Sequence, residues 1–377
     1  MADLAGPPGS AARVSPLAQI LAERIRSRGP LSVAAYMAAA LGDPRHGYYA
    51  TRDPLGAQGD FITAPEISQI FGELAGLWCV DFWRRWGAPA RVVLAELGPG
   101  RGTLMADALR AARVAPGFAQ AMDLHLVETS PALRAAQAKT LAAAAPRWHD
   151  AIDALPPGPL LLIANEFLDA LPIRQLVRTA DGWHERRVGL GDDGESLVFT
   201  LDPAPAAPSL VPSHLRDAPA GAVFELRPAA ESLARTLAAR LAAAGGAALF
   251  IDYGHQRSAC GDTLQAVRRH RRHEILAEPG MADLTAHVDF AVFAASAEAG
   301  GARIWGPVTQ RAWLEALGIE TRAATLLAQA TAAQAEAIRS ACRRLTDPAA
   351  MGVLFKVLVL THPGAPAPDG FASAAPP

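Results

Sequence analysis

The sequence predicts an α/β protein built on a parallel sheet that helices cover on both faces. Between residues 91 and 254, short apolar runs alternate with Ala-rich stretches of helical period, which is the pattern of βαβ units. Three glycines at alternate positions, Gly98, Gly100 and Gly102, join the first apolar run to a helical stretch. With 377 residues, of which 51% are hydrophobic, the chain can bury a core large enough for more than one lobe.

The N-terminal part predicts a helical lobe over residues 16–90, after a disordered start at 1–15. Ser15 and Pro16 are typical of the N-cap and the first position of a helix. Two loop-like stretches rich in polar and aromatic residues interrupt the helical pattern, and such loops often carry function. Helices are expected at 16–26, 32–41 and 65–86.

The α/β core is expected at 91–172 and 221–362. Its apolar runs are continuous, which is typical of strands buried on both faces of a parallel sheet. Strands are expected at 92–97, 123–127, 146–150, 159–164, 247–252 and 353–360. Helices are expected at 103–113, 228–244, 309–317 and 331–344.

Residues 173–220 interrupt this core with a different pattern. Three short alternating runs, joined by Asp-Gly turns, predict a small antiparallel insertion. A Pro- and Ala-rich linker at 202–220 follows it. The tail at 363–377 is expected to be disordered.

Composition and charge narrow the class of protein. A net charge of −2 gives no case for a nucleic-acid or membrane-surface partner. The three cysteines lie far apart without metal spacing, which predicts a reducing compartment and no metal site. Neither a secretory signal nor an integral membrane segment is visible, so a cytoplasmic location is the default expectation. The basic run 268–273 fits either a guiding surface for an acidic protein segment or a solvated strand.

The glycine-rich turn is the strongest functional signal. Glycine allows positive φ and close approach of a ligand to the backbone. Thr103 stands where the dinucleotide fingerprint has its third glycine, so the spacing is G-x-G-x-G. This form resembles the first motif of class I S-adenosylmethionine-dependent methyltransferases, although a simple tight turn is the alternative. The candidate cofactor contacts here are Glu96, Gly98, Pro99, Gly100 and Gly102.

Polar residues also follow the next two strands, where ligands of parallel sheets bind. Glu128 can accept hydrogen bonds from the ribose hydroxyls of a nucleoside, or it can simply neighbour the N-cap at Ser130. Asp150 can accept from an adenine amino group while Ala151 covers the ring. An exposed loop aspartate is the alternative for Asp150.

The fourth strand ends in a segment with an amide and two carboxylates, Asn165, Glu166 and Asp169. Carboxylates pair bidentately with a guanidinium and can hold its nitrogen toward a methyl donor, so these three are the catalytic candidates. Capping of the following turn is the alternative.

Three further residues are candidate substrate contacts. Glu66 ends a loop-like stretch, and Asp252 ends the fifth strand, where it orients a neighbour or caps the loop. Asp283 is expected to cap a helix whose first turn holds His287, in a structural or a catalytic role. No Gly-x-Ser-x-Gly or His-Glu-x-x-His pattern supports a hydrolase.

Five segments together resemble the MidA family, whose mitochondrial members are protein-arginine methyltransferases that assist assembly of respiratory complex I. The segments are 59–72, 96–105, 164–172, 251–255 and 282–290. The resemblance implies a seven-stranded, Rossmann-like methyltransferase sheet, S-adenosyl-L-methionine as cofactor and an arginine of a complex I subunit as substrate. It also implies that the three glycines line the cofactor, Glu128 holds its ribose, and Asn165 and Glu166 face the acceptor.

Two other functions stay open at this point. One is a non-catalytic assembly chaperone that retains a cofactor pocket, and the other is a methyltransferase for a small molecule. The sequence does not give the oligomeric state, the acceptor arginine or the degree of methylation.

Overall fold

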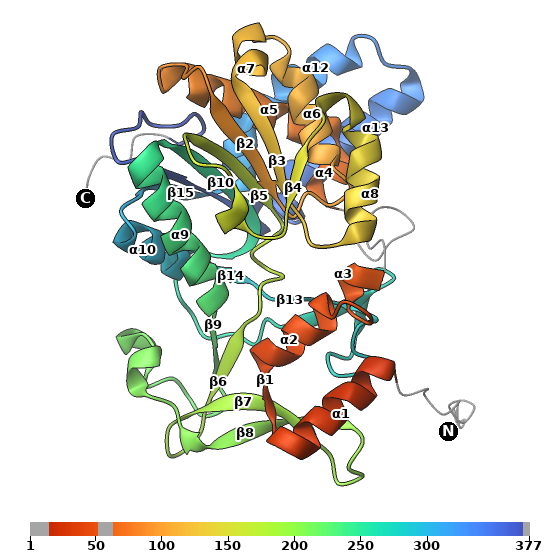
Figure 1. The fold of residues 1–377 in the computed structure, drawn as a ribbon, viewed down its shortest axis with the longest axis vertical. Coiled ribbons are helices and arrows are strands. Elements are labelled where there is room, and N and C mark those ends of the chain that lie inside the picture. The colour runs from red at the N-terminus through yellow and green to blue at the C-terminus, as the bar shows by residue number, and fades with distance from the viewer. Residues whose placement is uncertain (1–14, 52–62, 372–377) are drawn as a thin grey trace.

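The structure is a computed structural model that describes residues 15–51 and 63–371. It has two lobes: a large sheet with flanking helices, and a smaller lobe in which the N-terminal helices pack on antiparallel strands (Figure 1). Apart from Ser15, the predicted disordered start lies outside the described residues. So does much of the loop between the N-terminal helices, including the first part of segment 59–72.

The large sheet has the strand order β15-β16-β10-β5-β2-β3-β4. Strands β10, β5, β2, β3 and β4 are parallel, whereas β16 runs antiparallel to both β10 and β15. The two-residue strand β14 (Val288–Asp289) adds to the end of β10. The seven strands of the path are β2 (Val92–Leu97), β3 (Met122–Val127), β4 (Arg147–His149), β5 (Leu160–Asn165), β10 (Gly246–His255), β15 (Arg303–Thr309) and β16 (Phe355–Thr361).

Helices cover both faces of this sheet, as predicted. Along β2, Leu94 packs into the cluster formed by α5 and α6, whereas Val93 and Leu97 pack into the cluster formed by α9 and α10. Alternate residues of one strand therefore serve two cores. The helices of this lobe are α5 (Gln69–Arg85), α6 (Thr103–Ala112), α7 (Pro116–Ala121), α8 (Pro131–Thr140), α9 (Pro228–Ala244), α10 (Phe290–Ala299), α11 (Gln310–Ala316), α12 (Ile319–Leu327), α13 (Ala332–Thr346) and α14 (Met351–Leu354).

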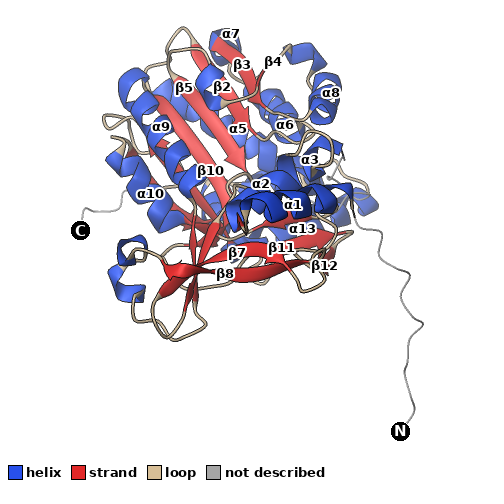
Figure 2. Ribbon diagram, turned by 60° about the horizontal axis from the view of Figure 1, so that its bottom comes forward, coloured by secondary structure: helices blue, strands red, loops and turns tan. Residues whose placement is uncertain are grey.

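The smaller lobe combines the predicted N-terminal helices with the predicted antiparallel insertion (Figure 2). Its main sheet has the order β1-β7-β6-β9, with β8 paired to β7, and a three-stranded sheet β12-β11-β13 lies nearby. One apolar cluster joins Leu17, Tyr36, Val188 and Leu284, which come from four distant segments. The elements are α1 (Pro16–Arg28), α2 (Val33–Gly42), α3 (Tyr48–Thr51), β1 (Leu31–Ser32), β6 (Arg174–Arg178), β7 (Trp183–Leu190), β8 (Leu197–Pro205), β9 (Val223–Leu226), β11 (Gln265–Arg268), β12 (Arg271–His273) and β13 (Asp283–Thr285).

Some predicted elements differ from the structure. The helix expected at 65–86 is broken at Ser68 into α4 (Ala64–Ile67) and α5. The helix start expected at Asp283 was wrong, because that residue begins strand β13. Asp289 is the actual N-cap of α10, and its carboxylate accepts from the backbone N–H groups of Ala291 and Val292.

The C-terminal segment is ordered further than expected. Ala365 and Phe371 are buried, and the indole Nε1 of Trp78 donates to the carbonyl of Asp369 at 3.1 Å. Disorder from residue 363 was therefore the wrong expectation up to Phe371, and residues 372–377 lie outside the described chain. The supposed linker at 202–220 continues β8 to Pro205 and then forms two 3₁₀ turns.

Candidate cofactor and substrate site

A cavity of about 400 Å³ opens at the carboxyl ends of the parallel strands, between the sheet and the N-terminal helices. It lies beside β2, where the strand order reverses, because β3 and β4 follow on one side of β2 and β5 on the other. This is the usual ligand position in such folds. Ala38, Leu41 and Tyr49 form the wall opposite the sheet. The predicted site residues that line the cavity are Glu66, Glu96, Gly98, Pro99, Gly100, Glu128, Asp150, Asn165 and Glu166.

The three glycines have different surroundings although each has a positive φ, at 60°, 55° and 83°. A Cβ on Gly98 would lie 2.9 Å from Cδ2 of Phe167, so this glycine makes room for a ring of the protein itself. A Cβ on Gly102 would meet Leu141 at 3.2 Å, behind the loop. Gly102 does not line the cavity, and neither does Ala151, so their predicted direct contact with a cofactor is not supported.

The buried side chain of Gln137 joins the ends of three strands. Its Nε2 donates to the carbonyl of Gly100 at 2.7 Å and to Glu128 Oε2 at 3.2 Å, and its Oε1 accepts from Trp148 Nε1 at 2.8 Å. Sequence reasoning missed this residue. A signal was present, because Gln137 stands between Leu133 and Leu141 at four-residue spacing on the apolar face of α8.

Glu128 both lines the cavity and caps the local chain. Its Oε1 accepts from the backbone N–H of Ser130 at 2.8 Å, and burial raises the pKa of the carboxyl while the hydrogen bonds lower it. Asp150 lies beside it with an exposed side chain, and its Oδ1 accepts from Arg134 Nη2 at 2.6 Å. The structure shows the contact of Glu128 with the N-cap at Ser130, and the contact with a ribose stays a prediction for a residue that lines the cavity.

Glu96 is 3% exposed at the end of β2. Its buried Oε2 has no hydrogen-bond partner among the described residues. Burial raises the pKa of this carboxyl to about 8, so it holds a proton at neutral pH until a cation lies against it.

Glu166 directly follows β5 with a left-handed backbone φ of 51°, which is uncommon for a residue with a side chain. Its Oε1 accepts from the backbone N–H of Ala64 and from Asn165 Nδ2, each at 3.1 Å. Burial is the main reason that its pKa rises to about 7, and the nearby Asp169 adds to the effect. Because the Asn165 amide nitrogen faces this carboxylate, Asn165 Oδ1 points elsewhere, and it is buried without a partner in the described structure.

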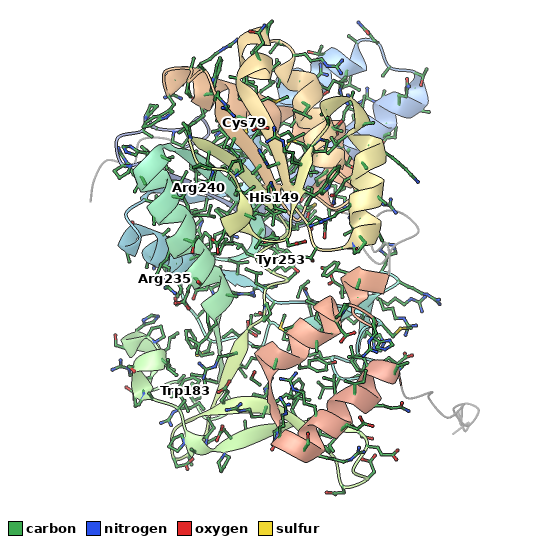
Figure 3. All side chains as sticks on the ribbon, in the orientation of Figure 1. Cys79, His149, Trp183, Arg235, Arg240 and Tyr253 are labelled. Atoms are coloured by element: carbon green, nitrogen blue, oxygen red, sulfur yellow. The ribbon has the colours of Figure 1, made fainter. Side chains whose placement is uncertain are left out.

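Asp169 and Asp252 do not line the cavity. Asp252 Oδ2 accepts from the backbone N–H groups of Phe167, Leu168 and Asp169 at 3.1, 2.8 and 3.2 Å, and burial raises its pKa. Asp169 Oδ2 accepts from the Tyr253 hydroxyl at 2.5 Å, and Tyr253 lies between the two lobes (Figure 3). The predicted catalytic role of Asp169 and the predicted substrate contact of Asp252 are therefore not supported, because both residues hold the loop that carries Glu166 and neither lines the cavity.

Of the other two candidate substrate contacts, Glu66 lines the cavity and His287 does not. His287 lies outside the cavity, where its carbonyl accepts from Arg227 and its ring meets the Tyr253 ring edge to face at 5.5 Å. Its predicted contact with substrate is not supported. Glu66 lines the cavity, and its Oε1 accepts from Thr103 Oγ1 at 2.6 Å, which links α4 to the start of α6.

The sheet order and the glycine turn define a class I methyltransferase fold, and comparisons with known proteins agree. A family model described as "Putative S-adenosyl-L-methionine-dependent methyltransferase" matches residues 74–308. A crystal structure from Burkholderia thailandensis with bound S-adenosyl-homocysteine has a TM-score of 0.81 and 31% identity over 98% of both chains.

Named relatives are similar over most of the chain. "Protein arginine methyltransferase NDUFAF7 homolog, mitochondrial" of Drosophila melanogaster is 39% identical over 91% of this chain and 84% of its own length. The Homo sapiens protein arginine methyltransferase NDUFAF7 is 38% identical over 83% of this chain and 76% of its own. The chain belongs to this family of S-adenosylmethionine-dependent methyltransferases, which confirms the predicted resemblance and the cofactor.

The comparisons also correct one expectation. These relatives are named mitochondrial, which overturns the default assignment to the cytoplasm. Over residues 15–51 and 63–371, no helix combines the length and apolar character needed to cross a membrane. The same residues contain no group of three or more His, Cys, Asp or Glu side chains placed to hold a metal ion.

Proposed function

We propose that this protein methylates an arginine side chain of a protein substrate, and that the substrate is a subunit of respiratory complex I. We infer the kind of substrate group that receives the methyl from the polar atoms that lack hydrogen-bond partners in residues of the cavity wall. Two residues that line the cavity, Glu96 and Asn165, each carry a buried side-chain oxygen without a hydrogen-bond partner in the described chain. Asn165 Oδ1 is an acceptor, and Glu96 Oε2 becomes one when the carboxyl ionises beside a cation. A ligand rich in N–H groups and positive charge satisfies such a wall. The names of the relatives and the family resemblance support the choice of a protein arginine.

The residues of the cavity fit the cofactor that the family uses. Glu128 is held by Gln137 and Ser130 in a position where it can accept from ribose hydroxyls. Asp150 suits the adenine amino group, and Gly98 with Gly100 presents backbone at the turn. Glu96 suits a positively charged group. The bound cofactor would supply a methyl group on a sulfonium.

Glu166 would position the acceptor. Its carboxylate pairs with the guanidinium and fixes one nitrogen in line with the methyl group, while Asn165 Oδ1 accepts another N–H. Transfer of the methyl group from the sulfonium to this nitrogen would make the nitrogen more acidic. It then gives up a proton, for which a carboxylate with a pKa of about 7 is a suitable acceptor.

The test is to incubate the purified protein with cofactor labelled in its methyl group and with cell extract. We expect label in a protein band that yields methylarginine on hydrolysis. Label in a small molecule would favour the small-molecule methyltransferase, and the absence of label would favour the non-catalytic chaperone. The variant Glu166→Gln should lose turnover about a hundredfold or more while cofactor affinity changes little. Equal activity would remove Glu166 from the acceptor site.

A further inference from the structure

The hairpin of β11 and β12 carries a concentrated positive charge that the proposed chemistry does not use. We call residues Arg268–His273 the basic hairpin; all six are Arg or His. Four of the chain's 35 Lys and Arg residues lie here within five positions, although the net charge of the whole chain is −2. Arg269, His270, Arg271 and Arg272 are exposed.

The fold holds the basic hairpin in a defined shape. Arg268 pairs with Arg271 in the antiparallel ladder, and the Arg268 guanidinium contacts Glu278 at 2.6 Å. At the tip, Arg269 and His270 have φ of 51° and 60°, a conformation that two-residue turns normally fill with Gly or Asn. Such strain in residues that carry charge often accompanies a binding role.

The basic hairpin also lies close to the cavity. Val267, the residue before it, pairs with Asp283 of β13, and Asp283 Oδ1 accepts from the Tyr49 hydroxyl at 2.9 Å. Tyr49 lines the cavity. The tip, at Arg269 and His270, lies two to three residues beyond the Val267–Asp283 pair, which is about 10 Å at the rise of a β-strand. One extended peptide can therefore reach both sites.

We propose that the basic hairpin binds an acidic segment of the protein substrate, close in sequence to the acceptor arginine. This inference rests on the proposed function and specifies its substrate class. The hairpin contains no Phe, Tyr or Trp, the large rings on which bases of a nucleic acid stack best, which disfavours a nucleic acid as the partner. None of the large exposed apolar side chains of the described chain belongs to the hairpin, which disfavours insertion into a lipid surface.

The test uses the double variant Arg271→Gln/Arg272→Gln and synthetic arginine peptides with or without a neighbouring block of Asp and Glu. We expect KM for the acidic peptide to rise roughly fivefold to thirtyfold, with kcat and the cofactor Kd unchanged. KM for the peptide without the block should not change. The matched control Arg84→Gln/Arg113→Gln removes the same charge from exposed positions elsewhere and should have no effect.

Charge reversal sharpens the result. With Arg271→Glu/Arg272→Glu, peptides that carry Lys in place of the acidic block should become the better substrates. An equal KM for both peptides with the wild-type protein overturns the proposal, as does a preference for anionic vesicles or single-stranded RNA over the acidic peptide.

Direct binding separates the two proposals. If no arginine peptide is methylated, the proposed function fails, and fluorescence anisotropy of a labelled acidic peptide still tests the hairpin. Binding that the Gln double variant abolishes then supports the hairpin alone, and unchanged binding rejects it.

Discussion

At the scale of single residues, Glu166 has two unfavourable properties at once. Its left-handed backbone costs on the order of 1–3 kcal/mol, and burial resists the charge on its carboxyl. Asp252 makes this geometry stable, because one of its oxygens accepts from the three backbone N–H groups that follow Glu166. The loop is therefore fixed before any ligand arrives, which is the condition for precise positioning.

The raised pKa of Glu166 predicts how activity depends on pH. Only the ionised carboxylate pairs with a guanidinium, so kcat/KM for an arginine peptide should rise with pH and level off above an inflection near 7. A bound guanidinium favours the charged form, so the inflection in kcat should lie at lower pH. The profile of Glu166→Gln should lack the inflection, whereas Glu23→Gln, an exposed control on α1, should retain it. An unchanged profile in Glu166→Gln would assign the titration to another group.

Gln137 is expected to act on the cofactor rather than on the methyl transfer. Gln137→Met keeps the length of the side chain but leaves the Gly100 carbonyl, Glu128 Oε2 and the Trp148 indole without this partner. Unpaired buried groups cost about 1–3 kcal/mol each, and part of this cost should appear as a cofactor Kd raised roughly tenfold or more. Calorimetry with Gln137→Met and with the exposed control Gln120→Met measures it. A lower kcat at saturating cofactor with an unchanged Kd would contradict this role.

At the scale of elements, the turn between β2 and α6 forms part of the cavity wall. All three glycines adopt positive φ, but only Gly98 and Gly100 line the cavity, whereas Gly102 packs toward α8. The regular spacing therefore serves both the packing of the protein and the approach of a ligand.

Gly100→Val should abolish cofactor binding. A β-branched residue at a φ of 55° is strained by about 1–2 kcal/mol or more, and its side chain adds bulk to a residue that lines the cavity. Gly194→Val is the matched control, because Gly194 also has a positive φ, at 70°, but stands in an open turn where an added Cβ would have no atom within 4 Å. Unchanged affinity of Gly100→Val by calorimetry would refute the cofactor role of the turn.

The elements that sequence reasoning identified are those whose signal is local. The strands at 92–97 and 159–164 and the helix at 228–244 match to within one residue, because a buried strand or an amphipathic helix shows its own period. Strand β15 was missed because Gly306 and Pro307 interrupt its pattern at the sheet edge. The role of Asp252 was left open because its partners lie more than eighty residues away in the chain.

At the scale of the whole molecule, the site depends on contacts between elements that lie far apart in the sequence. Ala64 of α4 donates to Glu166, and Glu66 accepts from Thr103. Among the helices, the buried carboxylate of Glu73 on α5 pairs with Arg110 of α6 and with Arg322 of α12. The end of the chain is part of the same assembly, because Phe371 is buried in the cluster that backs the sheet.

Truncation of Phe371 should therefore weaken the fold without altering the chemistry. Phe371→Ala removes a ring that is 6% exposed, and such changes typically cost about 3 kcal/mol or more. We expect a lower Tm by calorimetry, with kcat retained well below the transition. Val114→Ala, at a side chain that is 68% exposed, is the control and should leave Tm nearly unchanged. Equal melting of the Phe371→Ala and wild-type proteins would show that the C-terminal segment does not stabilise the core.

The way the smaller lobe is assembled also determines when it can form during synthesis. Strand β1, at residues 31 and 32, pairs with residues 187 and 188 of β7, and the apolar cluster under α1 and α2 includes Leu284. A ribosome delivers the first two helices long before these partners exist. The apolar faces of those helices are not fully covered until about three quarters of the chain has been made, so this lobe is completed late, after most of the large sheet can already pair.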